Sequence, residues 1–179
     1  MTIALITSIL AVTIRAGTSL LYATLGEILT ERAGIMNLGV EGIMIVGAVT
    51  GFAAAYHTGN VLIGVGVAMV AGAVLALIHA FLSISLRAEQ VVSGLALTIF
   101  ATGLSSFLGQ KLGPNGQPLV GLIGPRFKRI EIPFLSDLPV IGDAVFNQDL
   151  LVYAMFIFVI VSTLYLFRTR AGLNLRAVG

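Results

Sequence analysis

The sequence predicts an all-α, polytopic membrane protein with about five transmembrane helices. Hydrophobic residues make up 58% of the 179 residues, and charged residues only 10%. The mean hydropathy of +1.05 is far above that of a soluble domain of this length. The apolar residues also gather in runs that can each cross most of a bilayer core of about 30 Å. We therefore expect residues 1–179 to form one membrane domain with spans near 8–29, 36–56, 61–86, 91–112 and 150–167.

The first apolar run covers residues 3–29 and contains one charged side chain in its middle, Arg15. As a helix this run would be about 40 Å long, so its first turns can lie in the interface while Arg15 reaches the headgroups. An Arg15 that faces the protein interior is the alternative. The run lacks the basic start and cleavage site of a signal peptide, so we expect it to be retained.

A cluster of charges follows the first run and marks a membrane boundary. Glu27 and Glu31 lie four residues apart on one helical face, and Arg32 is next in the chain. Two carboxylates in this arrangement repel each other, so we expect a cation nearby, either Arg32 or Arg87. Alternatively, both carboxylates reach headgroup water.

The second run begins with three residues suited to a polar helix start, Asn37, Gly39 and Glu41. We expect Asn37 to be the N-cap of this helix and Glu41 to follow in its first turns. The free N–H groups at such a start can face a solute pathway or packed protein, and glycine also permits close helix contact.

Periodic patterns distinguish the next two runs. Small residues recur at every fourth position of the third run, which predicts close contact with another helix. Polar residues and a glycine follow the same stride in the fourth run, so we expect that face to contact protein or water. Their hydroxyls bond either to protein carbonyls or to solute in a pore. The small residues are Gly64, Ala68, Gly72, Ala76 and Ala80, and the polar stripe is Gln90, Gly94, Thr98, Thr102, Ser106 and Gln110.

Residues 113–149 contain all five prolines and predict a long loop outside the membrane. The fifth run, 150–167, is apolar on every face, so much of it is expected to contact lipid. Orientation follows from the basic residues in the short connections, which favour the cytoplasm. They place the N-terminus outside and residues 168–179 inside. These basic residues are Arg32, Arg87, Arg168, Arg170 and Arg176.

No pattern in this chain predicts catalysis or a metal site. A phosphate loop is absent, because the only lysines are Lys111 and Lys128 in the predicted outer loop. The chain has no cysteine, and His57 and His79 lie far apart without a second ligand near either. We interpret His79 as hydrogen-bonded to a neighbouring helix and His57 as a solvated turn residue. The basic excess of two does not suggest nucleic-acid binding, and lipid headgroups are the expected counter-charges.

Five spans with a polar stripe and a boundary charge cluster suit a pathway for a polar solute. Since no nucleotide can be hydrolysed in this chain, the energy must come from a partner or from an ion gradient. A proton- or sodium-coupled secondary transporter is therefore the alternative class, with Glu27, Glu31 or His79 as a titrating relay.

Three stretches in order carry a family resemblance: LGEILTERAGIMNLGVEGIMIVGA, AEQVVSGLALTIFATGL and LFRTRAGLNLRAVG. Together they resemble the permease subunits of ABC importers for nucleosides and simple sugars, relatives of the ribose and branched-chain amino acid permeases. The resemblance implies a multi-pass protein of the bacterial inner membrane that pairs with a second permease subunit. It also implies an external solute-binding protein and a cytoplasmic ATPase that holds the ATP and magnesium, with no cofactor in this chain.

The same resemblance and the polar pattern give two expected functional regions. The expected solute pathway comprises Asn37, Gly39, Glu41, Gln90, Gly94, Thr98 and Thr102. The expected ATPase-coupling segment comprises Arg168, Arg170, Gly172, Leu173, Asn174, Leu175 and Arg176. There we expect Gly172 to end the fifth span and a short helix to follow it, which either docks on the ATPase or only anchors the span to headgroups. Family members continue for more than a hundred residues, so the chain resembles an amino-terminal fragment.

Overall fold

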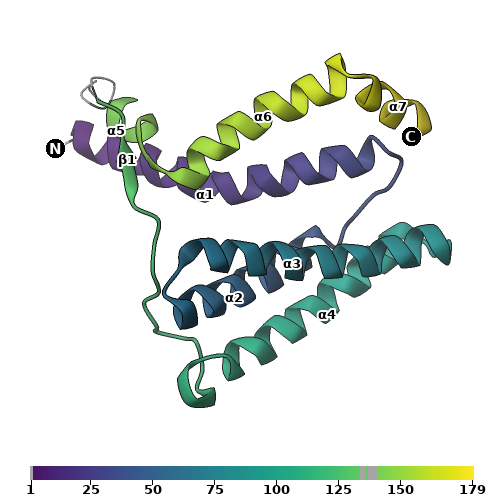
Figure 1. The fold of residues 1–179 in the computed structure, drawn as a ribbon, viewed down its shortest axis with the longest axis horizontal. Coiled ribbons are helices and arrows are strands. Elements are labelled where there is room, and N and C mark those ends of the chain that lie inside the picture. The colour runs from purple at the N-terminus through teal and green to yellow at the C-terminus, as the bar shows by residue number, and fades with distance from the viewer. Residues whose placement is uncertain (1, 134–135, 137–140) are drawn as a thin grey trace. The chain divides into compact units, whose positions relative to one another are not determined.

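The computed structural model describes residues 2–133, 136 and 141–179. Within these residues, five helices are long and apolar enough to cross a membrane. They are Leu5–Glu31, Val40–Thr58, Val61–Ser85, Gln90–Lys111 and Leu150–Arg168. The predicted helical membrane class is therefore confirmed (Figure 1). The chain divides into two compact units, Met1–Ala33 with Phe127–Gly179, and Gly34–Arg126. The prediction of one domain over residues 1–179 stays a prediction.

The first unit contains two long helices that run side by side, α1 (Thr2–Glu31) and α6 (Leu150–Arg168) (Figure 1). The Tyr22 hydroxyl donates a hydrogen bond to the Leu151 carbonyl at 2.8 Å. The Tyr22 ring also meets Phe158 edge to face, with 5.9 Å between the ring centroids. These contacts fix α6 along the second half of α1.

Short elements fill part of the segment that we predicted as a loop. Strand β1 (Arg129–Glu131) pairs antiparallel with β2 (Asn147–Asp149), and helix α5 (Ile141–Val145) precedes β2. Tyr153 on α6 joins the strands, because its hydroxyl donates to the Ile130 carbonyl and accepts from the Gln148 amide. The Gln148 side chain is fully buried and donates to the Ala144 carbonyl at 2.6 Å.

A sharp break separates α6 from the last helix, α7 (Arg170–Val178). The break lies at Thr169, which has extended backbone angles and whose side chain accepts a hydrogen bond from the Gly172 amide. Our prediction that Gly172 ends the span is therefore wrong. Gly172 is a buried residue inside α7, where a Cβ atom would come within 2.7 Å of Leu166 Cα. A glycine is needed there because α7 folds back tightly on the end of α6.

The second unit contains α2 (Val40–Thr58), α3 (Val61–Ala80) and α4 (Gln90–Lys111). Helices α2 and α3 pack antiparallel through small residues. A Cβ atom at Gly51 would lie 2.9 Å from Ala68 Cβ, and one at Gly64 would lie 2.7 Å from Ala55 Cβ. The predicted small-residue contact is therefore confirmed at Gly64 and Ala68.

Helix α4 packs on the other side of α2 in a parallel direction. Gly42 meets Thr98 and Ala101 near the start of the contact, and Gly109 meets Val49 near its end. The buried core of the unit is formed by Val46, Leu75, Leu97 and Ala101 from all three helices. The outer faces keep large apolar side chains exposed, as expected of helices in contact with lipid.

Two short irregular helices complete the second unit. A π-helical turn, η1 (Phe81–Ser85), continues α3, and a 3-10 turn, η2 (Pro114–Gly116), follows α4. Neither was predicted. His57 is exposed, as predicted, but it lies in the last turn of α2 instead of in a turn between helices, with its Nε2 atom 2.7 Å from the Leu112 carbonyl oxygen.

Candidate functional site

The candidate site is a non-helical stretch, residues 34–39, bound along the first turns of α4. Gln90 holds the stretch at two points. Its Oε1 atom accepts from the Met36 amide at 2.8 Å, and its Nε2 atom donates to the Gly34 carbonyl at 3.4 Å. Two turns further along α4, the Thr98 hydroxyl donates to the Leu38 carbonyl at 3.0 Å. These contacts satisfy backbone groups that would otherwise be costly near apolar surroundings.

Two glycines let the stretch and α4 approach each other backbone to backbone. A Cβ atom at Gly94 would lie 2.9 Å from the Leu38 nitrogen and 3.0 Å from the Gly39 nitrogen. A Cβ atom at Gly39 would lie 2.9 Å from Leu97 Cδ2 and 3.3 Å from the Gly94 carbonyl oxygen. The contacts at Gly94 are with backbone atoms and are too short for a Cβ atom, whereas the shortest contact at Gly39 is with the end of the Leu97 side chain. Gly94 therefore sets how closely this stretch packs on α4.

The Asn37 side chain is buried and caps a turn rather than the helix itself. Its Oδ1 atom accepts from the Gly39 amide at 3.0 Å, and the N-cap of α2 is Gly39. Our prediction of Asn37 as the N-cap is therefore wrong. An asparagine that bonds the backbone two residues on forms an Asx turn, which delays the helix until Val40.

A buried polar cluster supports the same stretch from α3. His79 is 2% exposed, with Nδ1 lying 3.0 Å from the Ser93 hydroxyl and Nε2 lying 3.3 Å from the Met36 carbonyl oxygen. Because a carbonyl only accepts, Nε2 is the donor in the contact with Met36. Ser83 in the π-helical turn lies 3.3 Å from Ser93 and closes the cluster.

Of the residues predicted for the solute pathway, five meet in one place: Asn37, Gly39, Gln90, Gly94 and Thr98. The other two lie outside these contacts. Glu41 is exposed in the first turn of α2, and the exposed Thr102 donates to the Thr98 carbonyl at 2.8 Å. A solute-pathway role for all seven stays a prediction.

Sequence reasoning found His79 as a partner of a neighbouring helix, and its contact with Ser93 on α4 confirms that interpretation. It missed Ser83 and Ser93. The available signal was the four-residue spacing of His79 and Ser83 on one face, with a serine in the first turn of the next helix.

The predicted boundary charges lie at the end of α1. Thr30 donates a hydrogen bond to Glu27, whereas Glu31 and Arg32 are both exposed. Within the residues described, no ion pair joins Glu31 to Arg32. Across the same residues no three His, Asp or Glu side chains gather to hold a metal ion, and the absence of a metal site stays a prediction.

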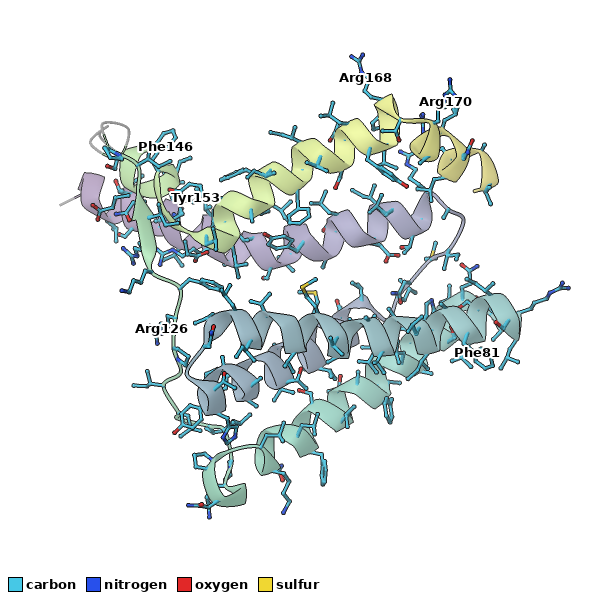
Figure 2. The ribbon with its side chains drawn as sticks, viewed as in Figure 1. Phe81, Arg126, Phe146, Tyr153, Arg168 and Arg170 are labelled. Atoms are coloured by element: carbon cyan, nitrogen blue, oxygen red, sulfur yellow. The ribbon has the colours of Figure 1, made fainter. Side chains whose placement is uncertain are left out.

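The predicted coupling segment forms α7, and its arginines differ in their surroundings. Arg168 and Arg170 are exposed on either side of the break between α6 and α7 (Figure 2). Arg176 is half-buried instead, with its guanidinium 5.0 Å from the centroid of the Phe167 ring and its Nε atom 3.4 Å from the Gly172 carbonyl oxygen. Arg176 therefore helps to hold α7 against α6.

Five apolar helices, with a bound non-helical stretch between two of them, define a multi-pass helical membrane protein. The chain belongs to the family described as the permease component of the branched-chain amino acid transport system, which matches residues 8–179. This match confirms the family resemblance drawn from the three sequence stretches.

Three curated relatives support the same assignment. "Putative glucose ABC transporter permease protein TsgC13" of Haloferax volcanii is 42% identical over 96% of this chain and 51% of its own length. "Guanosine ABC transporter permease protein NupQ" of Bacillus subtilis is 36% identical over 89% of this chain and 52% of its own. "Nucleoside ABC transporter permease protein NupC" of Lactococcus lactis is 34% identical over 90% and 52%.

The chain thus spans about half the length of the curated relatives it matches. No solved structure matches it.

Proposed function

We propose that this chain forms part of the pore of an ATP-driven importer for a small polar solute, a nucleoside or a simple sugar. The observation that carries the proposal is the family match over residues 8–179, together with relatives named for glucose, guanosine and nucleosides. The pore would be completed by a second permease subunit, in a homodimer or a heterodimer, in the bacterial inner membrane. The N-terminus would lie outside and α7 in the cytoplasm, following the basic residues of the short connections.

The chemistry of the second unit is compatible with this role. The 34–39 stretch is an irregular backbone segment between two spans. In transport proteins such a segment is tolerated where it lines a cavity or is buried in protein. Beyond it on α4, Thr102 and Ser106 are exposed hydroxyl groups on the stripe that also carries Thr98. They would offer hydrogen bonds to the hydroxyls of a sugar or ribose ring.

Energy would come from a separate cytoplasmic ATPase that holds ATP and magnesium, and solute would come from an external binding protein. Helix α7 is the proposed ATPase contact in this chain. Its exposed residues include Arg170, Leu173 and Asn174, which a partner can reach, while Gly172 and Arg176 hold the helix in place.

Uptake in the source organism, with and without the permease gene, tests the proposal. Labelled guanosine, other nucleosides, glucose and ribose are offered in turn, and uptake of one class should disappear with the gene and return when the full-length permease is restored. An inactive ATPase should abolish the same uptake, whereas collapse of the proton and sodium gradients at constant ATP should not. Loss of uptake with the gradients alone would favour a secondary transporter and overturn the proposal.

A further inference from the structure

A groove opens between the C-terminal ends of α1 and α6, and its volume is about 280 Å³. Its apolar walls come from Leu25 and Ile28 on α1 and from Leu166 and Phe167 on α6. Leu166 is buried and forms part of the wall, while Phe167 is 55% exposed. The groove therefore has a firm apolar side against which a flexible hydrocarbon chain can pack.

The groove lies at the C-terminal ends of two helices that are long and apolar enough to cross a membrane. Its lining residues other than Arg32 fall in the last two turns of these helices, which end at Glu31 and Arg168. From Leu25 to Arg32 a helix rises about 10 Å, so the groove reaches from the boundary into the upper part of the hydrocarbon core. This is the depth of the glycerol and the first methylenes of a phospholipid.

The polar lining contains one acid and one base, Glu31 and Arg32. Both side chains are exposed, and no ion pair joins them in the part of the chain that the structure describes. Each charge is therefore available to a ligand that carries the opposite charge. Ser162 adds a hydroxyl from the facing wall on α6.

We propose that this groove binds a zwitterionic phospholipid with a primary amine, of the phosphatidylethanolamine type. The phosphate accepts hydrogen bonds from Arg32, the ammonium group donates to the Glu31 carboxylate, and one acyl chain follows Ile28 and Leu166 downwards. A purely anionic lipid fits less well, because its headgroup meets the Glu31 carboxylate. A choline headgroup fits less well because its quaternary nitrogen has no hydrogen to donate.

A solute of the transport pathway is a poorer occupant. The volume lies just below the range of small-molecule pockets, about 300–1,000 Å³. The two charged residues of the lining, Glu31 and Arg32, both lie at the C-terminal end of α1, as the headgroup end of a lipid requires.

The test measures lipid binding to the purified full-length permease, by native mass spectrometry and by titration with fluorescent lipids of identical acyl chains. We expect the ethanolamine lipid to bind more tightly than the choline and glycerol lipids. Glu31→Gln should remove the preference for ethanolamine over choline. Arg32→Gln should weaken all three lipids roughly twofold to fivefold, as expected for one exposed charge-assisted contact. The matched controls Glu131→Gln and Arg126→Gln, at exposed positions outside the groove, should change nothing.

A second measurement does not depend on charge variants. A photo-crosslinker at Thr163, an exposed residue of the groove wall, should capture lipid in native membranes. Capture of another part of the permease would show that protein covers the groove and would overturn the proposal. Equal binding of the three lipids, or a preference that survives Glu31→Gln, would also overturn it.

Discussion

The Met36 amide donates a hydrogen bond to Gln90 Oε1 at 2.8 Å, although the two residues lie 54 positions apart in the chain. Through this bond the first residue of α4 holds a stretch that is not helical, just before α2 begins. Further along α4, Gly94 and Thr98 contact the same stretch.

Replacing Gln90 by leucine should destabilise the second unit. Both hydrogen bonds to the 34–39 stretch are lost, and since both are exposed to water we expect each to contribute about 0.5–1.5 kcal/mol. The thermal unfolding midpoint of the purified permease measures this loss. Gln110→Leu, at an exposed position on the same helix, is the control and should leave the midpoint nearly unchanged. Equal midpoints for the two variants would show that the Gln90 contacts contribute nothing measurable.

Gly94→Ala should be destabilising even though alanine favours helices. The new Cβ atom would lie 2.9 Å from the Leu38 nitrogen, and relieving such overpacking costs about 1–3 kcal/mol. Gly103→Ala on the same helix is the matched control, because a Cβ atom there meets nothing within 4 Å. The control should be neutral or stabilise the helix by up to about 1 kcal/mol. Opposite signs for the two substitutions in one unfolding assay are expected, and a stable Gly94→Ala protein would contradict the close approach.

The Thr98 and Thr102 hydroxyls bind different groups. Valine at each position therefore distinguishes an effect on stability from an effect on solute uptake. Thr98→Val removes the bond to the Leu38 carbonyl and should lower the free energy of unfolding by about 1 kcal/mol. Thr102→Val removes only a bond to the preceding turn of α4 and should leave stability nearly unchanged. If Thr102 lines the pathway, its valine variant lowers solute uptake at normal protein levels. Unchanged uptake would remove Thr102 from the pathway.

The sequence predicted which faces of the helices make contact, because side-chain size and polarity repeat with the helical period. Gly64 and Ala68 were placed correctly for this reason, since close helix contact depends on their small volume alone. The same stride marked Gln90, Gly94 and Thr98 as facing protein or water. It did not identify their partner, because periodicity defines a face of one helix and carries no information on which segment covers it.

The local errors have a different cause. Asn37 has the right chemistry for an N-cap but also for an Asx turn, and the close contact of Gly39 with α4 favours the turn. Gly172 has the right chemistry for a helix end, yet it is needed for contact with Leu166. In both cases the residue type suits two local structures, and tertiary packing determines which of them forms. The π-helical turn at Phe81–Ser85 has no comparable signal in the sequence.

The arginines of α7 can be separated by their contacts. Arg176 lies over the Phe167 ring and reaches the Gly172 carbonyl, whereas Arg170 is exposed and makes no hydrogen bond or ion pair within the described residues. Reversing the charge of Arg176 should therefore release α7 from α6, while reversing that of Arg170 should change only the surface that a partner meets.

Arg170→Glu should lower the ATP hydrolysis stimulated by solute-loaded binding protein, while the unfolding midpoint of the permease stays unchanged. Arg176→Glu should lower both, because loss of the cation–π contact alone costs about 0.5–1 kcal/mol at a partly exposed site. Arg176→Lys keeps the charge, so it should retain more of both properties than Arg176→Glu. The contrary result is normal ATPase stimulation in Arg170→Glu, with reduced stimulation only in variants whose unfolding midpoint is lowered. It would show that these arginines matter only for the stability of α7. In that case the exposed face of α7 would not be the ATPase contact, and the basic residues would serve to anchor the span to anionic headgroups.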